Sequence, residues 1–238
     1  IESDKSDIAL HILNPADGTL VRRYAPRCPT AHWDETLSLA SPVLSAADGS
    51  LYFLFGFSFL GCAQHWDAAG NQAIWKTSMD IDKGWPRSWY GAPPLLAEGA
   101  IYVGGDSANT QSVITAIDTA NGLMRQLTVE QDYKLTPLAV RAGILIVRAE
   151  RTRGSKRFEL WGLEAKSGQR RWQYVIQALD PVGGSISGGE WAARLTPRGL
   201  SIVQVLPDPD RLIVETLDPQ TGVSAGQATT SLDSDAFW

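Results

Sequence analysis

The sequence predicts an all-β protein built from one repeated sheet, and three observations support this fold class. Five segments share an apolar run, a polar turn and a second extended run, with turn glycines at Gly18, Gly70, Gly122, Gly168 and Gly222. These glycines are 52, 52, 46 and 54 residues apart, and a period near 50 residues is typical of propellers and other repeat arrays. No stretch carries the i, i+3, i+4, i+7 apolar pattern of a helix over three turns.

The turn glycines predict a β-hairpin in each copy. The dipeptides Asp17-Gly18, Asn121-Gly122, Ser167-Gly168 and Thr221-Gly222 supply the positive φ that closes a tight turn. In the third copy, side chains alternate over residues 113–118 with a period of two, as a strand requires.

A second hairpin precedes each of the last four copies. Its turns are Asp48-Gly49, Glu98-Gly99, Ala142-Gly143 and Arg198-Gly199. Pro42, Pro94, Pro137 and Pro197 are expected to open its first strand, where no ladder N–H is needed. Each repeat then has four antiparallel strands, A to D, which is the blade of a β-propeller.

We therefore predict a single β-propeller domain, or a propeller fragment, over residues 1–238. It contains a partial blade at 8–24 and full blades at about 38–76, 92–127, 135–175 and 192–228. Four and a half blades leave open sheet edges, which pair readily with other strands. We expect them to belong to a larger ring of seven or eight blades, completed by the remaining blades or by a protein partner. The alternative is an irregular five-bladed ring with a two-stranded first blade.

Composition narrows the function classes. The net charge of −5 disfavours a nucleic-acid partner, and no apolar run is long enough to span a membrane. Because the chain starts at Ile1 rather than methionine, we expect upstream residues such as a signal peptide or an anchor. Cys28 and Cys62 are either two buried thiols or one disulfide between neighbouring repeats, which would fit an oxidising compartment.

The segments LWGLEAKSGQRRW and CAQHWDAAGNQAIW carry a more specific pattern, in which Trp172 and Trp75 end the second strand. The other copies have Tyr24, Gln126 and Gln227 near that slot. The pattern resembles the pyrroloquinoline-quinone-like (PQQ-like) repeat. This resemblance implies a propeller, commonly eight-bladed, whose slot tryptophans dock one blade on the next. Kelch repeats share the period but need a double glycine per blade, and only Gly104-Gly105 fits.

The PQQ-like family contains quinoprotein dehydrogenases and non-enzymatic relatives, including the outer-membrane assembly lipoprotein and the sensor domains of bacterial receptor kinases. The resemblance implies that the dehydrogenases use adjacent cysteines, a stacked tryptophan, a calcium ion and an aspartate base. Cys28 and Cys62 are 34 residues apart, and no other feature assembles that site. We therefore expect no catalytic residues, no metal and no quinone cofactor. A PQQ-dependent dehydrogenase, or a degenerate fragment of one, is the alternative.

Histidines and loops supply the remaining candidates. His11 and His65 lie at strand C positions and are expected to pack or to face the surface, whereas His32 belongs to a weak His-Trp-Asp-Glu motif. The long D–A connections are rich in aromatic and charged residues, which is the composition of a binding surface. Their candidate ligand- or partner-binding residues are His32, Trp33, Asp34, Trp85, Arg87, Trp89, Tyr90, Glu190 and Trp191. These aromatic residues could instead only cover the blade ends.

The B–C loop of the fourth blade, RAERTRGSKRF, is basic. It is either a solvated hairpin tip or a contact for an acidic partner. The sequence thus favours an extracytoplasmic, non-catalytic binding or scaffold module that recognises a protein or a small ligand through loops at one face.

Overall fold

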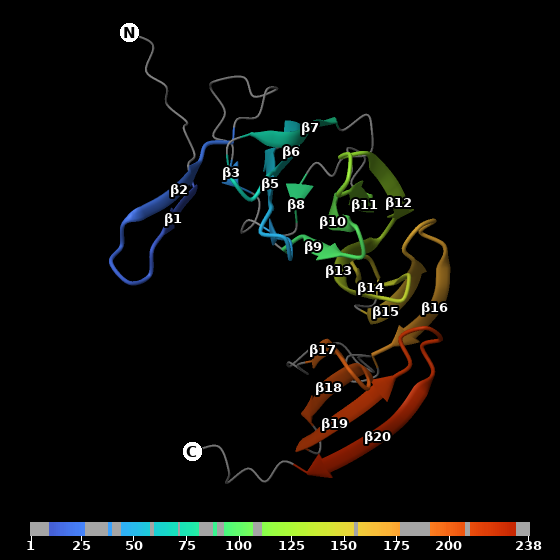
Figure 1. Ribbon diagram of the computed structural model, residues 1–238. Coiled ribbons are helices and arrows are strands. Elements are labelled where there is room, and N and C mark those ends of the chain that lie inside the picture. Colours follow the sequence, from blue (N-terminus) through green and yellow to red (C-terminus); the bar gives the residue numbers. More distant parts are fainter. Residues whose placement is uncertain are drawn as a thin grey trace. The chain divides into compact units, whose positions relative to one another are not determined.

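A computed structural model of the chain describes residues 10–26, 38–39, 44–57, 60–70, 72–80, 88–89, 93–106, 111–154, 157–176, 191–207 and 210–231. These residues form antiparallel strands and turns, and none of them is helical (Figure 1). The chain divides into two compact units, Ile1–Gln126 and Leu127–Trp238. No helix in the described part of the chain is long and apolar enough to cross a membrane. The all-β prediction is confirmed.

Unit 1 begins with a hairpin of β1 (Leu10–Leu13) and β2 (Leu20–Tyr24). Blade two follows, with β3 (Ser38–Leu39), β4 (Leu44–Ser45), β5 (Leu51–Phe57), β6 (Leu60–Trp66) and β7 (Ala73–Asp80). Blade three contains β8 (Ser88–Trp89), β9 (Leu95–Ala97), β10 (Ala100–Asp106), β11 (Ser112–Asp118) and β12 (Met124–Glu130), the last of which crosses the boundary between the units. In both blades strand A consists of two short pieces that pair with different parts of strand B.

Unit 2 contains two regular four-stranded sheets. Blade four is β13 (Tyr133–Arg141), β14 (Ile144–Arg151), β15 (Phe158–Glu164) and β16 (Arg170–Val175). Blade five is β17 (Trp191–Thr196), β18 (Gly199–Pro207), β19 (Asp210–Leu217) and β20 (Ser224–Ser231). In each sheet the spatial order of the strands equals their order in the chain, as in a propeller blade.

Two prolines lie elsewhere than predicted. Pro94 directly precedes β9, as expected, and Pro42 lies outside the described residues. Pro137, however, lies inside the edge strand β13, where the register with β14 shifts; a bulge on an edge strand does not need the missing N–H. Pro197 follows β17 and belongs to the turn into β18, where its fixed φ suits a tight turn.

The C–D turns confirm the predicted hairpins. In the third copy Gly122 has a φ of 73°, and its amide donates to the Asp118 carbonyl at 2.9 Å. In the fifth copy Gly222 has a φ of 69°, and its amide donates to the Asp218 carbonyl at 2.8 Å. The left-handed backbone conformation favours glycine at these positions.

In unit 1 the slot residues pack against the turn of the next copy. The Trp75 indole N–H donates to the Thr119 carbonyl at 2.9 Å, and a Cβ atom at Gly122 would lie 2.7 Å from the Trp75 ring. Tyr24 takes the same position one copy earlier, and its hydroxyl donates to the Ala68 carbonyl at 3.3 Å. A small residue in the turn therefore admits the aromatic ring of the preceding copy.

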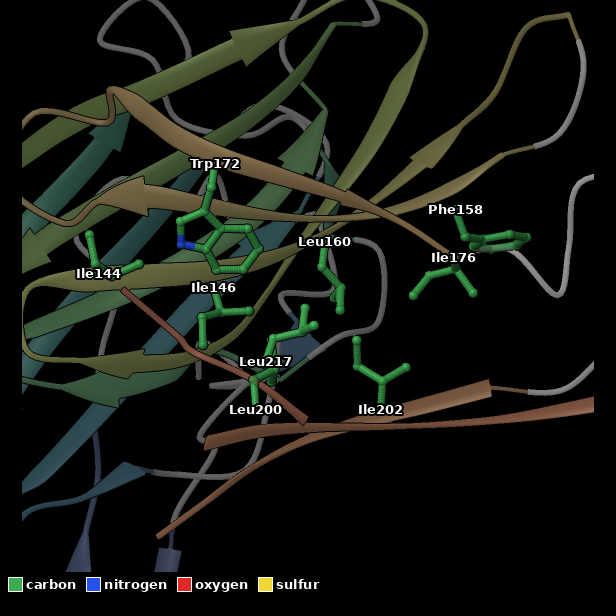
Figure 2. Close-up of a cluster of buried hydrophobic side chains, with 9 residues drawn as sticks. All are labelled: Ile144, Ile146, Phe158, Leu160, Trp172, Ile176, Leu200, Ile202 and Leu217. Atoms are coloured by element: carbon green, nitrogen blue, oxygen red, sulfur yellow. The ribbon is translucent and has the colours of Figure 1, made fainter. Parts of the chain in front are cut away.

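In unit 2, a slot tryptophan packs in the same way against the turn of the next copy, at the edge of the apolar core. Trp172 donates its indole N–H to the Pro219 carbonyl at 3.0 Å and contacts the turn at Gly222. Figure 2 shows the apolar side chains of blade four facing those of blade five across the space between their sheets. The cluster contains Ile144, Ile146, Phe158, Leu160, Trp172, Ile176, Leu200, Ile202 and Leu217. This burial is the main stabilising contribution between the two blades.

Cys62 lies fully buried in β6 and is disulfide-bonded. The other cysteine of the chain is Cys28, which lies outside the described residues. The Cys28–Cys62 pairing therefore stays a prediction, to be checked by peptide mapping under non-reducing conditions.

Candidate functional site

Most of the predicted binding residues lie outside the described part of the chain. These are His32, Trp33, Asp34, Trp85, Arg87, Tyr90 and Glu190. Trp89 lies in β8, where its backbone is paired with Gly105. Trp191 is the first residue of β17 and has a described side chain. That the loops between consecutive blades gather at one face of the propeller stays a prediction. Of the predicted binding residues, Trp191 has a described side chain, and its contacts define a candidate site.

Trp191 belongs to an aromatic and cationic cluster in unit 2. Its ring lies edge-on to Phe158, with ring centroids 5.9 Å apart. The guanidinium carbon of Arg148 lies 5.1 Å from the Trp191 ring centroid and 5.4 Å from that of Phe158. These distances are within cation–π range for both rings. The Arg148 side chain is 41% exposed, and one of its N–H groups donates to the Glu150 carboxylate at 3.5 Å.

The topology places this cluster at one end of the two sheets. Phe158 starts strand C and Trp191 starts strand A, while Arg148 lies toward the end of strand B. In an antiparallel blade, these positions adjoin the B–C and D–A loops and lie opposite the A–B and C–D turns. We call this end of unit 2 the loop end.

Arginines dominate the loop end of blade four. Arg148, Arg151, Arg153 and Arg157 carry four positive charges, against negative charges on Asp132, Glu150 and Glu159. The ion pairs are Arg148–Glu150 at 3.5 Å, Arg153–Asp132 at 3.3 Å and Arg157–Glu159 at 2.9 Å. The first two pairs are largely solvated, and exposed ion pairs of this kind contribute little to stability. These seven residues together carry one excess positive charge, on a chain whose net charge is −5.

Glu159 is a buried carboxylate beneath these arginines, with 1% of its surface exposed. Its Oε2 accepts hydrogen bonds from the Trp161 indole at 2.6 Å and from the Gln173 amide at 2.8 Å. Its Oε1 pairs with Arg157 and accepts a longer bond from the Tyr133 hydroxyl at 3.5 Å. A buried carboxylate needs such partners to offset its desolvation. With both oxygens engaged, Glu159 anchors Arg157 and the Trp161 ring rather than offering a free base.

The Tyr133 side chain contributes to the same network. Its ring lies 4.9 Å from the Trp161 ring, edge to face. Burial raises the pKa of the Tyr133 hydroxyl, and the negative charge of Glu159 raises it further. The hydroxyl is therefore protonated at neutral pH and can donate to the carboxylate.

A second buried acid bridges the two sheets of unit 2. The Tyr174 hydroxyl of β16 donates to the Glu215 carboxylate of β19. Burial raises the pKa of Tyr174, and the hydrogen bond to Glu215 adds to that shift. Glu215 is 7% exposed, so this pair serves as a polar link within the core.

The sequence pattern indicated the basic B–C loop and Trp191 as candidates for binding. It did not indicate Glu159, Phe158 or their partners. The available signal was the strand FELWGLE, where an acidic residue interrupts an apolar run. A buried acid in a strand is uncommon unless it is paired, but two of the partners of Glu159, Tyr133 and Gln173, are distant in the sequence.

A groove lies at the opposite, turn end of unit 2. Its volume is about 700 Å³, and it is lined by Ala142, Gly143, Ile144, Glu164, Lys166, Arg171, Gln220 and Thr221. Arg171 is paired with Glu164 at 3.1 Å, and the Gln220 amide donates to the Arg141 carbonyl at 2.9 Å. Arg171, Glu164 and Gln220 thus interact with other groups of the protein. The groove is therefore a weaker candidate for a binding site than the loop end.

Among the described residues, no three His, Cys, Asp or Glu side chains gather in a way that could hold a metal ion. Glu159, which is the best-placed buried acid of the loop end, has both oxygens occupied by protein donors.

The comparisons with known proteins bear on the fold alone. No family model and no curated protein matches the chain. Among solved structures, the chain is similar to a europium-containing methanol dehydrogenase, at 13% identity and a TM-score of 0.51 over 92% of this chain. It is also similar to a Bacteroides ovatus protein assigned as a dipeptidyl aminopeptidase IV, at 13% identity and a TM-score of 0.62 over 98% of this chain.

The chain spans 47% of the methanol dehydrogenase chain and 34% of the Bacteroides ovatus chain. Together with the consecutive antiparallel sheets, these likenesses establish the predicted fold, an all-β protein of the β-propeller type.

Proposed function

We propose that this chain is a non-catalytic β-propeller module that binds an acidic protein segment at the loop end of unit 2. The observation that carries the proposal is the position of the Arg148 guanidinium against the Phe158 and Trp191 rings, among further arginines. Arg and Trp are enriched where proteins bind one another.

The chemistry of the cluster supports an acidic partner. A guanidinium that lies over aromatic rings keeps the N–H donors at its edge for a carboxylate, which it binds through two parallel hydrogen bonds. Arg153 is 79% exposed on its side chain, so it adds long-range attraction for a negatively charged segment. Glu159 holds Arg157 in place from below.

The test uses a fluorescein-labelled random copolymer of glutamate and tyrosine as the probe, followed by anisotropy at low and at high salt. We expect saturable binding that weakens with salt, because surface charges are screened. The Arg148→Ala and Arg153→Glu variants should each bind about tenfold more weakly, a loss of about 1.4 kcal/mol.

The matched control is Lys166→Glu, which makes the same charge change as Arg153→Glu at the turn end of the same blade. It should change the affinity less than about twofold, because it lies outside the loop end. If Lys166→Glu weakens binding as much as Arg153→Glu does, the probe senses net charge alone and the proposed site is wrong.

A quinoprotein dehydrogenase, or a degenerate form of one, is the second candidate. Its support is the PQQ-like repeat pattern around Trp75 and Trp172, together with the likeness to a methanol dehydrogenase. Incubation with pyrroloquinoline quinone and either calcium or a lanthanide, followed by dye-linked oxidation of alcohols and sugars, tests it. Robust turnover would replace the binding proposal with this one.

We further propose an extracytoplasmic location. The disulfide at Cys62 is its support, because such bonds persist in oxidising compartments. Expression with and without an export signal in a bacterial host should give oxidised cysteines and a higher unfolding temperature only for the exported chain. Equal stability of the two forms, with reduced thiols in both, would count against it.

A further inference from the structure

The hairpin β1–β2 has the features of strands C and D of a blade. The register between its strands shifts just before the turn, between Ile12 and Leu13. The same shift occurs at the end of strand C in blade two, blade four and blade five. The turn also repeats the hydrogen bond of the third, fourth and fifth copies, because the Gly18 amide donates to the Asn14 carbonyl at 2.8 Å. β1 is therefore a strand C.

A strand C in this protein normally lies between strand B and strand D. The strands β6, β11, β15 and β19 are all central in their sheets. In the part of the chain that the structure describes, β1 pairs with β2 alone. Its other edge therefore corresponds to the position that strand B occupies in the other blades.

Among the described residues, the edge of β1 that faces away from β2 is unpaired and carries none of the usual features that block pairing. Its sequence, Leu-His-Ile-Leu, contains no acidic residue, lysine or proline, which are the usual means of blocking an edge strand. The hairpin also exposes large apolar side chains, with Ile12 at 38%, Leu13 at 53%, Leu20 at 57% and Val21 at 60%. An isolated two-stranded hairpin is only marginally stable in water.

The other blades indicate what fits this edge. Their B strands, β5, β10, β14 and β18, are seven to nine residues long and mostly apolar, and each pairs antiparallel with strand C. In a second copy of the chain, these strands are already paired on both sides. A second copy therefore offers no free B strand among the described residues.

We propose that β1 pairs with strand B of an A–B hairpin, and that this hairpin belongs to a polypeptide segment outside these 238 residues. The hairpin would complete a four-stranded first blade, with its strand B paired to the edge of β1 and its strand A paired to strand B. The site is continuous with an existing interface, because Leu10 and Tyr24 already pack with Leu51, Phe53 and Trp66 of blade two. This inference is independent of the acidic-partner proposal.

The test uses a synthetic peptide with the sequence of residues 143–151, which is the B strand of blade four. Hydrogen exchange of the whole chain is measured with and without the peptide, and a dansyl label on the peptide reports binding. We expect the amides of residues 10–13 to exchange at least about tenfold more slowly when the peptide is bound. The control peptide has proline at the positions of Ile146 and Arg148, which removes N–H donors from the strand.

Two results would overturn the proposal. One is the absence of selective protection of β1 at millimolar peptide. The other is protection of β1 that rises with the concentration of the chain itself, together with a doubled mass in light scattering, since a second copy would then occupy the edge. Selective protection of residues 10–13 by the B-strand peptide but not by the proline control supports it.

Discussion

At the scale of single residues, some buried polar side chains have hydrogen-bond partners, whereas others, such as His65, have none among the described residues. Glu159 and Glu215 are bonded by neighbouring donors. His65 is buried in β6, yet both of its ring nitrogens lack a hydrogen-bond partner. Its ring is stacked on Tyr52, with centroids 4.3 Å apart, and lies edge-on to Trp75. His65 thus acts as an aromatic packing residue, as expected for a strand C histidine.

This packing makes the stability depend on pH. Burial lowers the pKa of His65, although the nearby Asp48 and Asp67 act in the opposite direction. The unfolded chain therefore binds a proton at a higher pH than the folded chain does. The stabilising contribution of the neutral ring is complete above about pH 6.5 and is lost as the pH falls from there to the folded pKa.

We predict that His65→Phe removes this pH dependence, because phenylalanine keeps the ring but cannot be protonated. Urea unfolding of both proteins between pH 7.5 and pH 5 measures it. The free energy of unfolding of the parent should fall more steeply over this range than that of the variant. Parallel curves would show that His65 does not titrate differently in the folded state. His11→Phe, at an exposed position, is the control for replacing a histidine by phenylalanine outside the core.

At the scale of elements, the contact between a slot aromatic residue and the next turn glycine joins consecutive blades. Gly222 combines a positive φ with a contact to Trp172, and a Cβ atom there would lie 2.7 Å from the indole ring. An alanine at this position would therefore have both a strained backbone and a steric clash.

We predict that Gly222→Ala lowers the free energy of unfolding by about 2–4 kcal/mol. The matched control is Gly226→Ala in β20, where no atom lies within 4 Å of the added Cβ. It should change stability by less than about 0.5 kcal/mol. Chemical denaturation monitored by tryptophan fluorescence compares the two variants. Equal effects would mean that the Trp172 contact does not join the blades.

At the scale of the whole molecule, the chain has two compact units with separate apolar clusters. Unit 1 contains the clusters around Tyr52 and Phe53, whereas unit 2 contains the cluster around Leu160 and Ile202. Repeat architectures of this kind open in steps, because most contacts join neighbouring repeats.

We therefore expect the two units to differ in their local stability. In native-state hydrogen exchange, Gly222→Ala should reduce the protection of β14 and β18 while leaving β5 and β10 unchanged. A parallel loss in all four strands would show that the molecule unfolds as one cooperative unit. The same loss of protection in the Gly226→Ala control would indicate a nonspecific effect of substitution in blade five.

Features that depend on neighbouring residues could be predicted from the sequence. A period of two in strands and left-handed glycines in turns are local requirements, so the C–D hairpins around Gly122 and Gly222 could be predicted. The slot residues Trp75 and Trp172 followed from the resemblance to the PQQ-like repeat. The order of the strands within each blade could be predicted as well, because strands joined by short turns are antiparallel neighbours.

The partners of buried charges and stacked rings, in contrast, depend on the tertiary structure. Glu159 accepts hydrogen bonds from Tyr133 and Gln173, which are distant from it in sequence and reach it only because the four strands of blade four lie side by side. Trp191 and Arg148 likewise come from neighbouring blades. Pro137 was predicted to open its strand but lies inside β13, because the bulge and the unpaired outer edge of that strand remove the need for its N–H. Such pairings depend on distances through space, which a repeat pattern along the chain does not contain.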